Sequence, residues 1–187
     1  MGLSITTGET MRTLNRTTGF LSFAVAIGVI VVFLAVMNWV PTAFQKDTLR
    51  RYRSIEEVRT ALNIRDIYVP SYFPQHIVWP PSEILAQGKP FPAVVMEFKA
   101  AGSSEIVLVL SQSQGGPFPA GPAIALAGVK ETVPFVMKGR KAVLVVGECS
   151  KNEPCSRITW KEGPYTVTAL MKASPFELTK ITESMLR

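Results

Sequence analysis

The sequence has 187 residues, a formal net charge of +6 at pH 7, two cysteines and one histidine. So few histidines and cysteines argue against a metal centre built from these residues and against histidine-based nucleophilic catalysis. The basic excess also lacks the interleaved aromatic residues typical of a nucleic-acid-binding surface. We therefore expect no metal, no cofactor, no nucleic-acid partner and no enzymatic activity.

The longest apolar stretch covers residues 20–40, which contain 21 consecutive residues without a charged side chain. As a helix this stretch would span roughly 30 Å, the thickness of a bilayer's hydrocarbon core. A cleaved signal peptide has a shorter apolar region and a small-residue cleavage site, whereas this stretch ends at Trp39, Val40 and Pro41. The sequence predicts a short tail (1–19) and a single transmembrane helix (20–40).

Two small residues, Ala24 and Gly28, lie four positions apart within this stretch. In a helix they share one face, which permits the close approach of a second transmembrane helix. The alternative is an ordinary apolar span with no packing motif. The sequence leaves both interpretations open.

A basic connector (41–53) follows the span, and we expect it to continue as a helix or a stiff linker. Its basic residues are Lys46, Arg50, Arg51 and Arg53. These side chains either contact anionic lipid headgroups or form a solvated helix face. Counted as positive-inside charges they would place the following domain in the cytoplasm, but this rule weakens when a long domain follows the span.

Residues 54–187 are long enough for one domain with a hydrophobic core. Ser54 and Glu57 form a capping-box pattern ahead of a short helix, Ile55–Leu62, for which Asn63 is a plausible stop. The following segment, 67–74, is a β-type run broken by prolines and cannot be a central strand. His76 lies just after it, and we expect a surface or half-buried histidine because no second histidine is present.

Apolar, β-branched runs separated by glycine-containing turns predict five or six antiparallel strands. The runs cover 93–99, 105–112, 133–137, 141–147, 157–161 and 165–171. Residues 114–121 are a loop by composition.

A C-terminal helix follows the last predicted strand. Ser174, Pro175 and Glu177 give a second capping-box signal, and Leu178 begins an apolar stripe that we expect to pack on the sheet. The predicted fold class is α+β: a short first helix, an antiparallel sheet and a C-terminal helix.

Cys149 and Cys155 bracket five residues at the facing ends of two predicted strands. A hairpin loop of that length could place their Cβ atoms within bonding distance. A disulfide would favour an extracytoplasmic domain, since such bonds persist in oxidising compartments. Free thiols are the main alternative, and a redox or metal role lacks the usual spacing and ligands.

Two stretches give the domain a resemblance to a known family: 54–74, with its capping box and Tyr-Val-Pro-Ser-Tyr-Phe-Pro sequence, and 141–187, with its Trp-Lys-Glu-Gly-Pro-Tyr strand and terminal helix. The order resembles an uncharacterised bacterial membrane-anchored extracytoplasmic domain, similar to the C-terminal domain of some anti-sigma-factor-type regulators. The resemblance implies an envelope domain on a single anchor in the bacterial inner membrane. It does not imply that this chain alone sequesters a sigma factor, because only 19 residues precede the span.

We therefore expect a non-enzymatic accessory or binding subunit of a larger membrane or envelope complex, with lipid and other subunits as partners. The alternative is an envelope signalling or stress-sensing regulator of the anti-sigma type. An envelope hydrolase is disfavoured because no nucleophile motif accompanies the single histidine. The sequence leaves the oligomeric state open.

Overall fold

The computed structural model describes residues 27–31, 34, 49–115 and 123–186. The chain divides into two compact units, Met1–Gln45 and Lys46–Arg187. Within the first unit, residues 27–31 and 34 are helical and include Gly28. The tail 1–19, Ala24, Lys46 and most of the predicted span lie outside the described residues. Among those that are described, no helix is long and apolar enough to cross a membrane.

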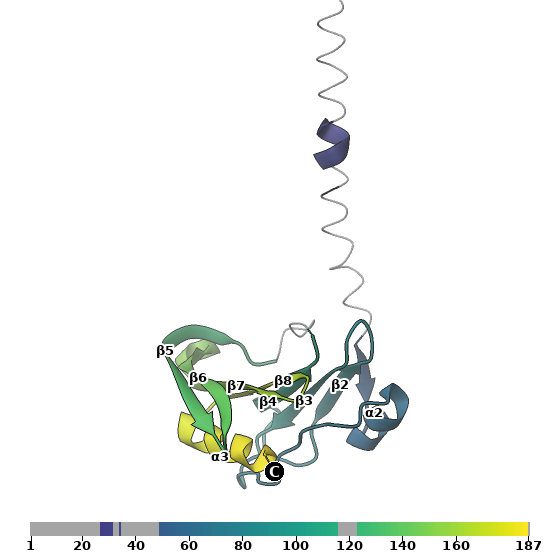
Figure 1. The fold of residues 1–187 in the computed structure, drawn as a ribbon. Helices are drawn as coiled ribbons and strands as arrows, with labels where there is room; N and C mark the ends of the chain where they lie inside the picture. Colours follow the sequence, from purple (N-terminus) through teal and green to yellow (C-terminus); the bar gives the residue numbers. More distant parts are fainter. Residues whose placement is uncertain (1–26, 32–33, 35–48, 116–122, 187) are drawn as a thin grey trace, which may run out of the picture. The chain divides into compact units, whose positions relative to one another are not determined.

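The second unit is built on an eight-stranded sheet in which every neighbouring pair of strands is antiparallel. The strand order is β1-β2-β3-β4-β8-β7-β6-β5 (Figure 1). The strands are β1 (Arg50–Tyr52), β2 (Glu83–Gln87), β3 (Ala93–Lys99), β4 (Ile106–Ser113), β5 (Leu126–Met137), β6 (Arg140–Cys149), β7 (Pro154–Glu162) and β8 (Tyr165–Met171). The α+β class is confirmed, but the expected five or six strands were too few.

The helix considered for the connector (41–53) is not found where the structure describes that stretch. Residues 50–52 form the edge strand β1 and pair with β2, so they are not helical. An ion pair of 2.6 Å between Arg51 and Glu83 joins the two strands. Strand β2 was missed altogether, because prolines flank it and its sequence, EILAQ, is not rich in β-branched residues.

Helix α2 (Ile55–Leu62) has the predicted bounds. The Ser54 hydroxyl accepts a hydrogen bond from the Glu57 amide at 3.1 Å, and Asn63 ends the helix in the left-handed conformation. The Glu57 carboxylate accepts from the Arg53 amide at 2.8 Å, one residue earlier than the ideal capping box. The helix start is therefore stabilised at both of the predicted positions.

Helix α3 (Pro175–Met185) packs on β7 and β8 through its buried residues Leu178, Ile181 and Met185. The prediction that this stripe covers the sheet is confirmed. The second capping box was wrong, because the Ser174 side chain makes no capping hydrogen bond. Glu177 lies instead 3.7 Å from the His76 ring nitrogen Nδ1. A short 3-10 helix, η1 (Ser150–Asn152), joins β6 to β7.

One face of the sheet, the helix-covered face, carries the larger core. Side chains that alternate along the strands, such as Met96, Phe98, Leu110 and Ile158, are 2% exposed or less. Helix α2, residues 64–77 and helix α3 contribute further buried residues to the same cluster. Figure 1 shows α3 across the β6–β7 end of the sheet and α2 beside β2.

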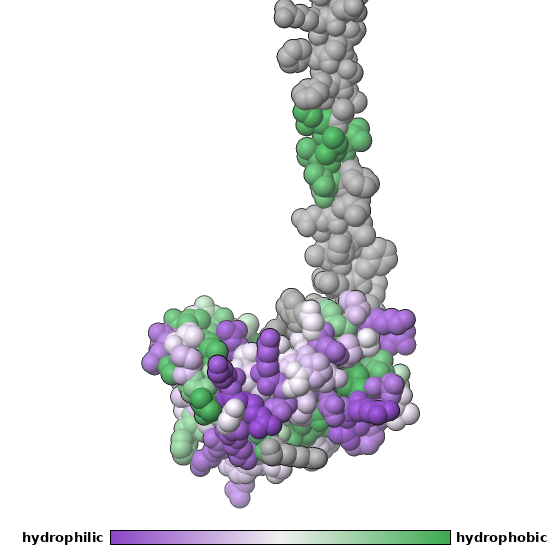
Figure 2. Space-filling view, viewed as in Figure 1, coloured by the Kyte–Doolittle hydropathy of each residue, from purple (hydrophilic) through white to green (hydrophobic). Residues whose placement is uncertain are grey.

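The opposite face, the disulfide face, carries a smaller cluster. Its buried members are Val95, Val109, Ile124, Cys149, Cys155 and Leu170. Toward the β5–β6 turn this face is more open, and Val143 is 41% exposed. In Figure 2 hydrophobic residues gather over the β5–β6 end of the sheet. Strand β8 contributes to both clusters: Val167 and Ala169 are buried on the helix-covered face, and Leu170 is buried on the disulfide face.

Strand β5 is one edge of the sheet and contains Pro134 opposite Val143. The two-residue turn at Lys138 and Gly139 has positive φ at both positions, as a type I′ hairpin requires. Counting back from this turn, Pro134 lies in a non-hydrogen-bonded pair, so its backbone nitrogen faces away from β6. An edge strand is the position in a sheet that tolerates proline.

Candidate functional site

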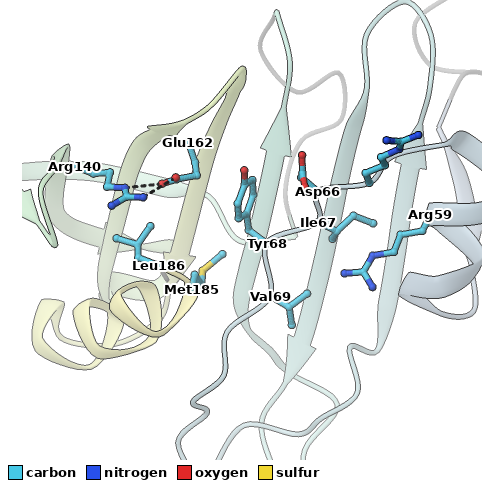
Figure 3. A pocket seen from close by; sticks show the side chains of 10 residues that line it. Arg59, Asp66, Ile67, Tyr68, Val69, Arg140, Glu162, Met185 and Leu186 are labelled. Carbon is cyan, nitrogen blue, oxygen red and sulfur yellow. Dashed lines mark hydrogen bonds and ion pairs between the residues drawn. The ribbon is translucent and has the colours of Figure 1, made fainter.

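A groove of about 260 Å³ lies beside the extended segment 65–69 (Figure 3). Residues from α2, the segment itself, β6, β7 and the end of α3 line it: Arg59, Arg65, Asp66, Ile67, Tyr68, Val69, Arg140, Glu162, Met185 and Leu186. The volume is near the lower limit for ligand pockets, and the mixture of charged and apolar side chains suits recognition of a polar partner.

The buried side chain of Gln112 holds segment 65–69 against the sheet. Its amide nitrogen donates to the Asp66 carbonyl at 2.7 Å, and its amide oxygen accepts from the Tyr68 amide at 2.9 Å. Gln112 is 2% exposed and lies on β4. One side chain therefore satisfies two main-chain groups of a segment that belongs to no strand.

The main-chain groups of Ile67 and Val69 face the other way. In an extended chain, successive residues direct their N–H and C=O groups to opposite sides, so these two residues face away from Gln112. Neither makes a hydrogen bond within the described part of the chain. The segment therefore presents strand-like main chain that no other described residue of the domain pairs.

One wall of the groove is a charged pair at the strand ends. Arg140 donates two hydrogen bonds to the Glu162 carboxylate, at 3.1 and 3.0 Å, and a third to the Lys138 carbonyl at 3.2 Å. Glu162 raises the pKa of Arg140 through these bonds. The Lys138 ammonium donates to the Leu186 carbonyl at 3.2 Å and ties the end of α3 to this wall. Because Arg140 and Glu162 form an ion pair with each other, their charges cancel.

Tyr68 stands between that wall and Asp66 (Figure 3). Burial raises the pKa of Tyr68, and the nearby charges of Asp66 and Glu162 raise it further. Burial followed by Asp66 likewise raises the pKa of Tyr165, whose ring meets that of Tyr68 edge-on at 6.1 Å. Both phenols stay protonated at neutral pH, so Tyr68 can donate a hydrogen bond into the groove.

Two arginines, Arg59 and Arg65, also line the groove. In Figure 3 the Arg59 side chain extends from α2 toward segment 65–69. Arg59 and Arg65 are exposed, and neither makes an ion pair with another described residue. These guanidinium groups are therefore available to a ligand, unlike that of Arg140.

A second hollow, of about 410 Å³, is lined by residues around β1 and β2, including Arg51, Arg53 and Glu83. Of the expected lipid-contacting residues, Arg51 forms an ion pair with Glu83, whereas Arg50 and Arg53 are exposed and make no such pair in the described part of the chain. The Arg51 side chain is still 76% exposed. Lipid contact by Lys46, Arg50, Arg51 and Arg53 stays a prediction.

Cys149 and Cys155 form a disulfide with a Cα–Cα distance of 5.3 Å, which confirms the predicted pairing. Both residues are buried, at 2% and 1% exposed. Lys172 forms an ion pair with Glu105 and a second with Glu153 at 3.0 Å, linking the cysteine loop to the β3–β4 turn. The buried bond therefore closes a surface loop that the Lys172–Glu153 ion pair also holds, as expected of a structural disulfide.

His76 is on the surface, with its side chain 54% exposed. This agrees with the predicted surface or half-buried histidine. Within the described residues, no three His, Cys, Asp or Glu side chains gather as metal ligands would.

Sequence reasoning did not find the groove, because its lining comes from five separate stretches of the chain. The one available signal was Gln112, a polar residue at the end of an apolar strand. Its burial depends on a segment more than 40 residues away, which no local pattern reveals.

The fold and the site define an α+β domain with an antiparallel sheet and an open groove across its helix-covered face. Comparisons with models of known protein families, with curated proteins and with solved structures find no match.

Proposed function

We propose that the chain is a non-enzymatic, single-pass membrane-anchored protein that acts as an accessory or binding subunit of a larger membrane or envelope complex. The observation that carries the proposal is the groove beside segment 65–69. It offers main-chain groups and two guanidinium groups that no other described residue pairs, together with a protonated phenol, and such groups are suited to recognising a partner. The uncharged stretch 20–40 supports a membrane anchor.

The proposed location is the bacterial inner membrane, with the sheet domain on its extracytoplasmic side. The buried disulfide supports this side, because disulfides persist in oxidising compartments and are rare in the cytoplasm. Protease added outside spheroplasts should then degrade the domain. Full protection of the domain until the membrane is opened would contradict the proposed orientation.

The binding role is tested by purifying the full chain from its native membrane in mild detergent and identifying every chain that copurifies. The expected result is one or more membrane or envelope subunits in stoichiometric amount. Recovery of the chain alone would contradict the accessory role. Stoichiometric recovery of a cytoplasmic regulator would replace it with the signalling alternative.

A further inference from the structure

The strand-like segment 65–69 is fixed on one side and open on the other. Gln112 satisfies the main chain of Asp66 and Tyr68, whereas that of Ile67 and Val69 has no partner within the described residues. We propose that the groove binds an extended, acidic segment of a partner protein, which pairs with the main chain of 65–69 as an added strand. This inference rests on the proposed binding function and assigns it a site and a ligand class.

Main-chain pairing supplies the sequence-independent part of the affinity. An extended peptide that adds to an exposed strand bonds through its own N–H and C=O groups. Five residues at about 3.3 Å each give a contact roughly 17 Å long. Because Gln112 already holds the segment in an extended form, little conformational entropy remains to be lost when the peptide binds.

Apolar side chains also line the groove. Met185 and Leu186, from the end of α3, are 6% and 5% exposed, and Ile67 is 6% exposed, so each offers a small apolar surface. Alternate side chains of an added strand point to the same side, so every second residue of the partner can meet these apolar side chains. This lining therefore favours apolar residues at alternate positions of the bound segment.

The charged groups of the groove that lack an ion pair among the described residues favour binding of an acidic segment over a basic one. Glu162 is neutralised by Arg140, which leaves Arg59, Arg65 and Asp66 without an ion pair among the described residues. Two free cations against one free anion give the groove a net positive charge. A carboxylate can form two parallel hydrogen bonds with one guanidinium, which adds geometric specificity.

The test screens the detergent-solubilised full chain against an immobilised library of random eight-residue peptides at low salt. We expect enrichment of peptides with apolar residues at alternate positions and at least one Asp or Glu. The double variant Arg59→Glu/Arg65→Glu should weaken binding of the best peptide at least tenfold. The matched control Lys141→Glu/Lys161→Glu makes the same change in net charge on the disulfide face and should leave the affinity within twofold.

Hydrogen exchange locates the bound peptide. The amides of Ile67 and Val69 should exchange quickly in the free chain and slowly when the peptide is present, while the Tyr68 amide stays protected in both. Unchanged exchange at Ile67 and Val69 would overturn strand addition. Enrichment of basic peptides, or an equal effect of the two double variants, would overturn the acidic ligand class.

The failure of this site and the failure of the proposed function give different results. If the subunits that copurify with the native chain also copurify with Arg59→Glu/Arg65→Glu, the binding function stands and the groove is not its site. If the variant abolishes self-association of the chain rather than binding of another protein, the occupant is a second copy and the proposed partner is wrong.

Discussion

Different interactions stabilise the two faces of the sheet. The helix-covered face relies on close packing of large side chains beneath α2, segment 64–77 and α3. The disulfide face has a small buried cluster, one covalent link and open strands toward β5 and β6. Hydrophobic stabilisation scales with the apolar area that is buried, so most of the stability should come from the helix-covered face. The second face contributes local constraint at one end of the sheet.

The largest effect should come from Phe98→Ala on the helix-covered face. Phe98 is fully buried, and its ring lies 5.2 Å from Phe73 and 6.2 Å from Trp79. Loss of the ring should lower the free energy of unfolding by about 3–5 kcal/mol. Val143→Ala on the disulfide face, where the residue is 41% exposed, should cost less than about 1 kcal/mol. Urea unfolding measures the free energy of unfolding of both variants. An equal loss in the two variants would refute the difference in stability between the faces.

Gln112→Leu tests how segment 65–69 is attached to the sheet. The change leaves the Tyr68 amide and the Asp66 carbonyl without their partner, which should cost about 2–4 kcal/mol in total. The control, Ser111→Ala, alters the adjacent residue on the opposite face, whose hydroxyl makes one 3.5 Å hydrogen bond, and should cost less than about 1 kcal/mol. Rapid exchange of the Tyr68 amide hydrogen in the Gln112 variant, but not in the Ser111 variant, would confirm that the Gln112 side chain holds segment 65–69.

Cys149→Ser/Cys155→Ser removes the covalent constraint on the disulfide face. The bond closes a loop with a sequence separation of 6, for which chain-entropy loss predicts about 2 kcal/mol of stabilisation. Thermal unfolding should show this loss under oxidising conditions. Under reducing conditions the variant and the parent chain should unfold together, and a persistent difference would mean that packing of the sulfur atoms, not the bond, stabilises the loop.

The smallest effect should come from Glu97→Gln, also on the disulfide face. Burial, and then the carboxylate of Glu83 directly opposite on β2, raise the pKa of Glu97. A raised pKa means that the folded state holds the proton more tightly. Stability from this group is therefore present at low pH and is lost as the pH rises through the raised pKa.

At pH 7 the Glu97→Gln variant should thus be more stable than the parent by less than about 1 kcal/mol, or a few degrees in Tm. The glutamine oxygen can still accept the hydrogen bond from the Ala123 amide. Near pH 4 the difference should disappear. Thermal unfolding across this range, with the exposed Glu131→Gln as control, checks the direction.

Local signals predicted the elements whose stability is local. Helix α2 was found with its bounds because its cap and its left-handed stop lie within ten residues of each other. Strands β3 and β8 were found because each is an apolar, β-branched run beside a glycine-containing turn. The class of fold follows from these elements and from α3.

Elements that depend on distant partners were missed. Strand β1 is three residues long and exists through its pairing with β2, and the first half of β5 is interrupted by two irregularities in register. One of these adjoins Gly147, where an added Cβ would lie 1.9 Å from the Gly128 carbonyl oxygen. That close backbone contact requires glycine, but the sequence alone gave no reason to place it there. The groove was missed for the same physical reason, since Gln112 joins two distant segments.

Pro134 has a consequence for how these molecules behave when crowded together. At high local concentration, an unprotected sheet edge can pair with the edges of other copies and build continuous sheets. With its backbone nitrogen turned outward, Pro134 interrupts the row of donors along β5 that such stacking requires. The β5 edge is thereby kept from pairing with other chains. Strand pairing with a partner is left to segment 65–69, whose neighbouring charges can select that partner.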